Sequence, residues 1–141
     1  SRQMPVVFPV HPRARRALDG QAALRAEGAK FITTEPLGYL DFLKLLMEAR
    51  LVLTDSGGVQ EETTILGVPC VTLRDNTERP VTLTHGTNRL GGTSTAGIRQ
   101  AIAEALAADA GRVREPPPLW DGRAAVRIAD VIERWAVERH P

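Results

Sequence analysis

The residues that could do chemistry gather in one short segment, from Asp55 to Glu62 (DSGGVQEE), directly after the apolar run Leu51–Leu53. We predict that the run is a buried parallel strand and that a helix follows, with the aspartate or Ser56 as its N-cap. The first turn of a helix has unpaired N–H groups and a partial positive charge, which attract phosphate. Gly57 and Gly58 lack the Cβ atoms that would keep a ligand from the backbone. The segment therefore predicts an anion site, although an ordinary capped helix explains the same local sequence.

Charged side chains near this turn indicate what kind of ligand it would bind. Glu61 and Glu62 fall within the first two turns of the helix, where a carboxylate would repel phosphate, so at least one should accept hydrogen bonds from neutral hydroxyls such as those of ribose. Arg74 and Arg79 lie in a polar loop after the next apolar strand. Loops that follow parallel strands meet at one edge of the sheet, so one of these arginines is expected to reach the same phosphate.

Strand-like and helical segments alternate along the chain, which predicts an α/β fold with a doubly wound parallel sheet in a single domain, residues 1–141. We expect strands at Val6–Phe8, Lys30–Ile32, Leu51–Leu53, Cys70–Leu73 and Asn88–Leu90. We expect helices at Pro12–Arg25, Tyr39–Ala49, Val59–Leu66, Ala96–Ala107 and Ala124–Val137. A proline-rich connection, Asp109–Gly122, precedes the last helix.

Composition excludes several classes of partner. The net charge is only +1 and aromatic residues make up 4% of the chain, so we expect no nucleic-acid partner. The basic residues Arg13, Arg15 and Arg16 favour a solvated helix face over a phosphate site. Cys70 is the only cysteine, which rules out a disulfide within the chain and favours the cytoplasm. We expect no membrane partner, since no apolar run approaches 18 residues, and no metal, since the three histidines are scattered.

Several motifs in this order resemble one known family. The strongest are Thr54–Glu62, Leu66–Pro69, Leu73–Pro80 and Gly86–Leu90. Shorter matches extend the similarity over nearly the whole chain, at Pro9–Pro12, Tyr39–Phe42 and Pro117–Gly122. Together they look like the carboxyl-terminal half of the non-hydrolysing UDP-N-acetylglucosamine 2-epimerases. The resemblance implies a three-layer α/β/α, Rossmann-like half of a glycosyltransferase-B type fold, acting on UDP or a UDP-N-acetylhexosamine without a cofactor.

The resemblance also assigns roles to residues of the glycine turn and its neighbours. It implies that Ser56, Gly57 and Gly58 bind the diphosphate of UDP and that Glu62 binds the ribose hydroxyls. The arginine of the family's Glu-Arg-Pro motif corresponds to Arg79, as a residue that binds substrate. An arginine fork suits bidentate contact with a phosphate or a carboxylate, and an ion pair with a neighbouring carboxylate, of Glu78 or Asp75, is the competing expectation.

Two further residues are implied to lie in the substrate cleft. Phe42 corresponds to the aromatic residue near the uracil, whose edge the backbone around Leu37 would bind; core packing explains Phe42 equally well. His11 corresponds to the histidine of a Pro-Val-His motif that lies near the nucleotide sugar and, in bacterial members, helps form a regulatory site. A histidine directly after a strand can also be a simple polar cap.

The chain departs from the family in a few places. Val81 stands where many members have an acidic residue, and Arg123 where histidine is common. Members are much longer, with an amino-terminal domain whose acidic residues move protons at sugar C2, and a His-Arg-Arg-Glu motif that this chain lacks. We therefore expect a carboxyl-terminal fragment or a divergent relative, with no catalytic residue of its own.

The expected function is the UDP-binding half of an epimerase that interconverts UDP-N-acetylglucosamine and UDP-N-acetylmannosamine by loss and re-addition of UDP. The alternatives are a non-catalytic UDP-sugar binding or regulatory module, and the donor-binding half of a glycosyltransferase of the same architecture. Because the family's first strand is missing, we expect a gap in the sheet. The exposed strands should either pair with a second copy, as a homodimer, or rearrange locally.

Overall fold

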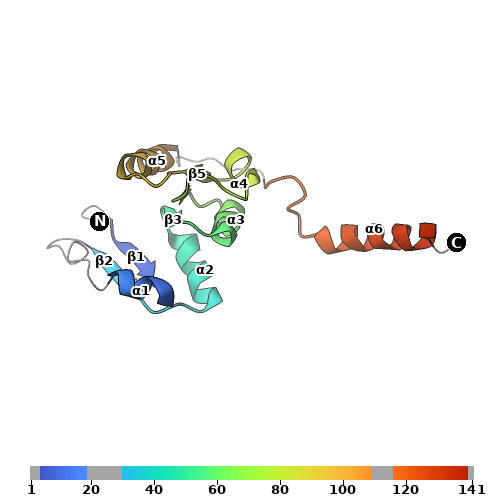
Figure 1. Ribbon diagram of the computed structural model, residues 1–141, viewed down its shortest axis with the longest axis horizontal. Helices are drawn as coiled ribbons and strands as arrows, with labels where there is room; N and C mark the ends of the chain where they lie inside the picture. Colours follow the sequence, from blue (N-terminus) through green and yellow to red (C-terminus); the bar gives the residue numbers. More distant parts are fainter. Residues whose placement is uncertain (1–3, 19–29, 109–115, 140–141) are drawn as a thin grey trace. The chain divides into compact units, whose positions relative to one another are not determined.

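The computed structural model describes residues 4–18, 30–108 and 116–139 and divides the chain into two compact units, with the boundary between Leu45 and Leu46. All described strands are parallel, which confirms the α/β class, but they form two sheets rather than one. Figure 1 gives the order of the elements.

The first unit holds a two-stranded sheet. Its elements are β1 (Val6–Pro9), α1 (Pro12–Leu18), β2 (Phe31–Thr34) and most of α2 (Tyr39–Glu48). The rings of Phe8 and Phe31 on the two paired strands have centroids 6.3 Å apart and a tilted arrangement, which is a favourable aromatic geometry. The predicted helix from Pro12 is confirmed as far as Leu18, and the rest of its predicted length lies outside the described residues.

The second unit holds a three-stranded sheet in the order β3-β4-β5. Its elements are β3 (Val52–Thr54), α3 (Gly57–Leu66), β4 (Cys70–Thr72), α4 (Val81–Thr84), β5 (Asn88–Leu90), α5 (Thr95–Ala108) and α6 (Ala124–Arg139). The run Leu51–Leu53 was expected to be a buried parallel strand; β3 is parallel, but it lies at an edge of its sheet and Leu53 is 44% exposed, so the expected burial is wrong for that residue. Helix α3 begins two residues before its predicted start, and the short helix α4 was not predicted.

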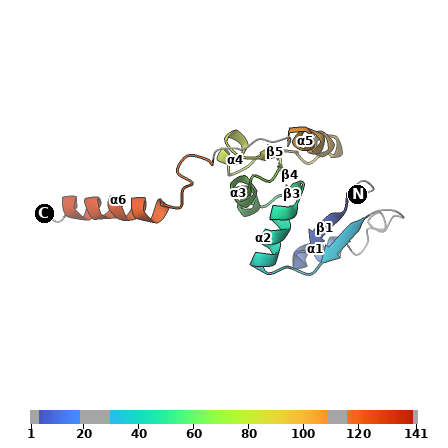
Figure 2. The same ribbon diagram turned by 180° about the vertical axis from the view of Figure 1, so that it is seen from behind.

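Strand β4 shows how the layers of this unit are built. Successive side chains of a strand point to opposite faces of the sheet. Val71 packs with Ala101 and Ala105 of α5, whereas the Cys70 side chain forms a hydrogen bond with Thr63 of α3. Helices α3 and α5 therefore cover opposite faces of the sheet, as Figures 1 and 2 show. This is the layered arrangement that the sequence predicts for the site-bearing part of the chain.

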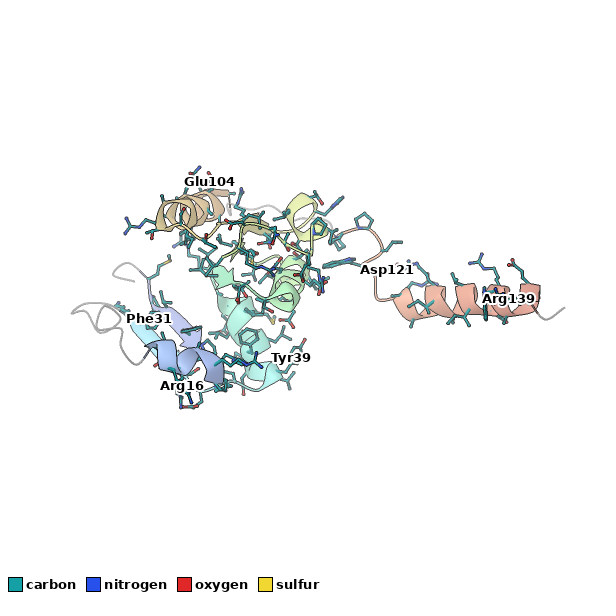
Figure 3. All side chains as sticks on the ribbon, in the orientation of Figure 1. Arg16, Phe31, Tyr39, Glu104, Asp121 and Arg139 are labelled. Atoms are coloured by element: carbon teal, nitrogen blue, oxygen red, sulfur yellow. The ribbon has the colours of Figure 1, made fainter. Side chains whose placement is uncertain are left out.

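Helix α6 has no buried residue. Its exposed apolar side chains include Ile128, Val131, Ile132 and Trp135, which share one face at helical spacing and are 53–59% exposed. Asp121 precedes the helix and Arg139 ends it, as labelled in Figure 3. An exposed apolar face is the feature expected for this helix if it packs on another part of a larger protein. In the part of the chain that the structure describes, no helix is long and apolar enough to cross a membrane.

Candidate functional site

The first turn of α3 has no side-chain cap. Ser56 has the extended backbone of an N-cap residue, with φ −83° and ψ 127°, but its side chain makes no capping hydrogen bond. Its carbonyl oxygen accepts from the Gln60 N–H at 3.2 Å, and its own N–H donates to Thr54 Oγ1 at 3.1 Å. Ser56 is therefore at the N-cap position, as predicted, but it does not cap the helix through its side chain. Without that cap, the first-turn N–H groups are left to another hydrogen-bond acceptor.

Packing does not explain the two glycines of this turn. Neither has a positive φ, and a Cβ added at Gly57 or Gly58 would come no closer than 3.8 Å to the atoms of the described chain. Other glycines of the same unit are required by close neighbours, since a Cβ at Gly86 would lie 2.4 Å from Thr64 Oγ1 and one at Gly91 would lie 2.8 Å from Val71. Ser56 and Gly58 are exposed and Gly57 is half-buried, so protein side chains do not bury the turn.

The loop after β4 brings an arginine to this turn. A Cβ at Gly57 would lie 3.8 Å from the Cγ, Nε and Cζ atoms of Arg79, so the guanidinium passes directly beside the first turn of α3. Of the two arginines considered, Arg79 is the one beside the turn, and its contact with a phosphate stays a prediction. Arg74 instead forms an exposed ion pair with Glu78 at 3.3 Å.

The carboxylate partner of Arg79 differs from the two expected. Its Nε lies 2.6 Å from Glu61 Oε1, and its Nη1 donates to the backbone carbonyl of Glu78 at 3.3 Å. The Nε atom is sealed from solvent and has no aligned hydrogen-bond acceptor, so the contact with Glu61 is electrostatic attraction rather than a directed hydrogen bond. Both side chains are about 40% exposed, so the pair adds little to stability. The other N–H groups of the fork are the ones that suit a phosphate.

Glu62 lies one helical turn beyond Gly58 on α3 and is half-buried. Residues four apart share one side of a helix, so this carboxylate is on the same side as the second glycine. Glu61 faces the arginine, and Glu62 is the carboxylate assigned to ribose, a role that stays a prediction.

The two remaining candidates belong to the first unit, and each is described by itself. His11 is exposed, and its Nδ1 accepts a hydrogen bond from the Arg13 N–H at 3.3 Å, so it acts as the polar cap that the sequence left open. Phe42 is half-buried in the first turns of α2, where its N–H donates to the Gly38 carbonyl at 2.9 Å. Their contacts with substrate stay predictions.

Sequence reasoning missed a set of polar residues beneath the glycine turn. Gln60 of α3 is 1% exposed and accepts hydrogen bonds from Thr77 in the arginine loop and Asn88 on β5. The available signal was the spacing of Gln60, Thr63 and Thr64, which puts three polar side chains on one face of a short helix. A polar face of that kind predicts exposure, whereas here it packs against the sheet.

Other features of the second unit do not extend the site. A shallow groove at the start of α5 is lined partly by Asp75 and Glu104, whose carboxylates disfavour a phosphate. Burial raises the pKa of the Cys70 thiol to about 11, against a smaller lowering by its hydrogen bond with Thr63, which makes it a poor nucleophile at neutral pH. Among the described residues, no group of three or more His, Cys, Asp or Glu side chains is placed to hold a metal ion.

The fold and this turn together define a class of protein: a parallel α/β protein in which an uncapped, glycine-opened helix follows one strand and an arginine follows the next. Comparison with known proteins identifies the family within this class. A profile described as UDP-N-acetylglucosamine 2-epimerase matches residues 1–133, and the chain belongs to this family.

Individual relatives agree with this assignment. The chain is 40% identical over 129 residues to the UDP-N-acetylglucosamine 2-epimerase of Methanococcus maripaludis, covering 90% of this chain and 34% of the relative. It is 39% identical over 132 residues to the UDP-2,3-diacetamido-2,3-dideoxy-D-glucuronate 2-epimerase of Pseudomonas aeruginosa, covering 92% of this chain and 35% of the relative. The chain thus spans about a third of the length of these relatives.

A solved structure is similar at the level of the fold as well. The UDP-GlcNAc 2-epimerase of Methanocaldococcus jannaschii, in complex with UDP-GlcNAc and UDP, matches with a TM-score of 0.79 and 39% identity, covering 94% of this chain and 36% of that protein. Such epimerases have a glycosyltransferase-B fold, so the fold class expected from the motifs is confirmed.

Proposed function

We propose that this chain is the carboxyl-terminal, UDP-binding part of an enzyme that interconverts UDP-N-acetylglucosamine and UDP-N-acetylmannosamine by elimination and re-addition of UDP. One observation carries the proposal: the first turn of α3 is uncapped, neither of its glycines is required by packing, and Arg79 lies beside it. A diphosphate accounts for all three features, because it needs N–H donors, close approach to the backbone and a cation.

The relatives support the UDP part of the proposal. The Methanocaldococcus jannaschii protein was solved with UDP-GlcNAc and UDP, and the Pseudomonas aeruginosa relative is named for a different UDP sugar. The names share UDP and the position of epimerisation and differ in the sugar. UDP, the group that this chain would hold, is therefore common to the substrates in these names.

The chemistry of the turn follows from the charge of the leaving group. Negative charge grows on the diphosphate as the bond to sugar C1 breaks, so N–H groups fixed at Gly57 and Gly58 and the fork of Arg79 would stabilise the transition state more than the bound substrate. Glu62 would orient UDP through the ribose hydroxyls, Phe42 would lie at the uracil, and His11 would lie near the sugar. Proton transfer at C2 is assigned to residues outside this chain.

Calorimetric titration of the 141-residue chain tests the proposal. UDP should bind, and uridine, which lacks the diphosphate, should bind far more weakly. Replacement of Gly58 by leucine should abolish UDP binding in a chain that remains folded. The chain alone should give little or no conversion between the two sugar nucleotides when they are separated and quantified. A folded chain that does not bind UDP would refute the assignment of this turn.

We also propose that the chain forms a homodimer, in the cytoplasm. Strand β3 is the edge of its sheet and leaves backbone groups to pair, and Cys70 is a buried free thiol, which suits a reducing compartment. Sedimentation should show a mass that rises with concentration. A monomer at all concentrations would contradict the dimer.

A further inference from the structure

Polar side chains are buried where the three-stranded sheet meets helices α3 and α4. Gln60 is 1% exposed, Thr72 and Thr82 are 0% exposed and Asn88 is 4% exposed. Buried polar groups are costly unless each finds a hydrogen-bond partner, so a core of this kind needs a specific arrangement to be tolerated.

Two amide side chains form the centre of that arrangement. Gln60 Oε1 accepts from Thr77 Oγ1 at 2.6 Å and from Asn88 Nδ2 at 3.2 Å. Asn88 Nδ2 also donates to Thr82 Oγ1 at 3.1 Å, and Asn88 Oδ1 accepts from Thr72 Oγ1 at 2.7 Å. Every donor and acceptor role is consistent, which fixes the orientation of the Asn88 amide. We name these five residues the amide network.

Two members of the amide network also form hydrogen bonds with the backbone of Arg79, one with its N–H and one with its carbonyl. Thr77 Oγ1 accepts from the Arg79 N–H at 3.0 Å, and Thr82 Oγ1 donates to the Arg79 carbonyl at 2.7 Å. The two threonines that hold the Arg79 backbone are thus two of the three that contact the buried amides. The backbone on each side of the Arg79 side chain is thus tied to α3, which begins with the glycine turn, and to β5.

We propose that the amide network positions Arg79 beside Gly57 before the ligand arrives, with Thr77 as the residue that transmits the constraint. The inference rests on the proposed function, since it assumes that Arg79 contacts the diphosphate. A cation that is already in place loses no binding free energy to reorganisation when the anion arrives. Arg79 has a long side chain, and the hydrogen bonds on both sides of it fix where that side chain starts.

The competing explanation is that the network only stabilises the fold. Thr77 distinguishes the two, because it is half-buried and at the edge of the network, so the chain should fold without its hydroxyl. Thr77→Val keeps the shape of the side chain and removes the hydroxyl. Thr77→Ser keeps the hydroxyl and is the matched control.

The experiment measures UDP binding by calorimetry for both variants, each in the wild-type and in the Arg79→Ala background, with thermal melts to verify folding. Thr77→Val should weaken UDP binding about tenfold, the effect of losing one hydrogen-bond equivalent, and Thr77→Ser should bind as wild type. In the Arg79→Ala background Thr77→Val should have no further effect on binding, although it still lowers thermal stability. A residue with only a structural role would not show this dependence on Arg79.

Three results would overturn the inference, and they are distinguishable. If Arg79→Ala weakens UDP binding and Thr77→Val does not, the positioning role is wrong and the proposed function stands. If Thr77→Val weakens binding equally with and without Arg79, the residue acts by another route. If wild type does not bind UDP, or Arg79→Ala binds it normally, the premise about Arg79 fails as well. Should Thr77→Val not fold, Thr77→Ala serves in the same comparison.

Discussion

The substitution Gly58→Ala should have opposite effects on stability and on binding. Gly58 is the second residue of α3, and a Cβ there would meet nothing closer than Ser56 Oγ at 3.9 Å, an ordinary contact. Replacing a helical glycine by alanine reduces the conformational entropy of the unfolded chain. We therefore expect a gain of about 0.5 kcal/mol in the free energy of unfolding, the low end for a first-turn position, or about 2 °C in melting temperature.

The same methyl group should obstruct the diphosphate. A phosphate oxygen that accepts from a first-turn N–H lies about 2.9 Å from the nitrogen, within contact distance of a new Cβ on the same residue. Displacing it costs roughly one charge-assisted hydrogen bond, about 1.5–3 kcal/mol. That corresponds to UDP binding weakened about 10- to 100-fold.

Calorimetry with UDP and thermal melts on the same samples separate the two effects. Gly67→Ala is the control, because Gly67 ends α3 at φ +70° and a Cβ there meets no atom within 4 Å. Its left-handed backbone should cost about 1 kcal/mol of stability without changing UDP binding. If Gly58→Ala binds UDP as tightly as wild type, the reasoning that places a diphosphate against this backbone is refuted.

Four further outcomes are expected. Arg79→Lys should weaken UDP binding about tenfold in calorimetry despite keeping the charge, because the planar fork is lost; unchanged affinity would contradict a forked contact. Wild type should prefer UDP over 2′-deoxy-UDP, and Glu62→Gln should reduce that preference; equal preference in both proteins would argue against a ribose contact. Burial raises the pKa of Cys70 to about 11, so the native thiol should react with a thiol-specific dye at pH 8 only after unfolding. The contribution of this thiol to the free energy of unfolding should be lost only as the pH rises from the ordinary thiol range towards that pKa. Fast labelling of the native chain would show that the thiol is accessible. Hydrogen bonds from the Arg127 side chain, and then from the Arg123 N–H, hold the pKa of Asp121 below its ordinary value. The pair of Asp121 and Arg127 should therefore stabilise the start of α6 at neutral pH and be lost only in acid, below the ordinary aspartate range. Far-UV circular dichroism of Arg127→Gln should show a smaller helical signal at neutral pH, and an unchanged signal would contradict this role.

Most elements of the fold were predictable because they depend on local pattern. Strand β5 is at its predicted bounds, and β1, β3 and β4 are each within one residue of theirs. The start of α3 was predicted two residues late, because two adjacent glycines usually indicate a loop, whereas here they form the first turn of the helix. Helix α4 was not predicted because four residues are too short for a helical period to be visible.

The partners of the site residues were less predictable. The loop position of Arg79 placed it near the glycine turn, but its carboxylate partner was expected within the loop and is Glu61, from another element. The burial of Gln60 was not expected, because an amide followed in the sequence by two glutamates is usually exposed to solvent. Both depend on contacts between segments 17 to 28 positions apart, as in the bonds of Gln60 with Thr77 and Asn88.

The sequence by itself determined the alternation of parallel strands and helices, the family, and the glycine turn as the place for a phosphate. The first two follow from periodicity and from residue types in order along the chain, which need no knowledge of tertiary packing; the phosphate at the glycine turn stays a prediction. Only the tertiary structure decided that Ser56 leaves the helix uncapped, that Glu61 attracts Arg79, and that buried amides hold the arginine loop. The physical reason is that a hydrogen-bonding group chooses its partner from all groups that folding brings within about 3 Å, and side-chain type alone does not specify that choice.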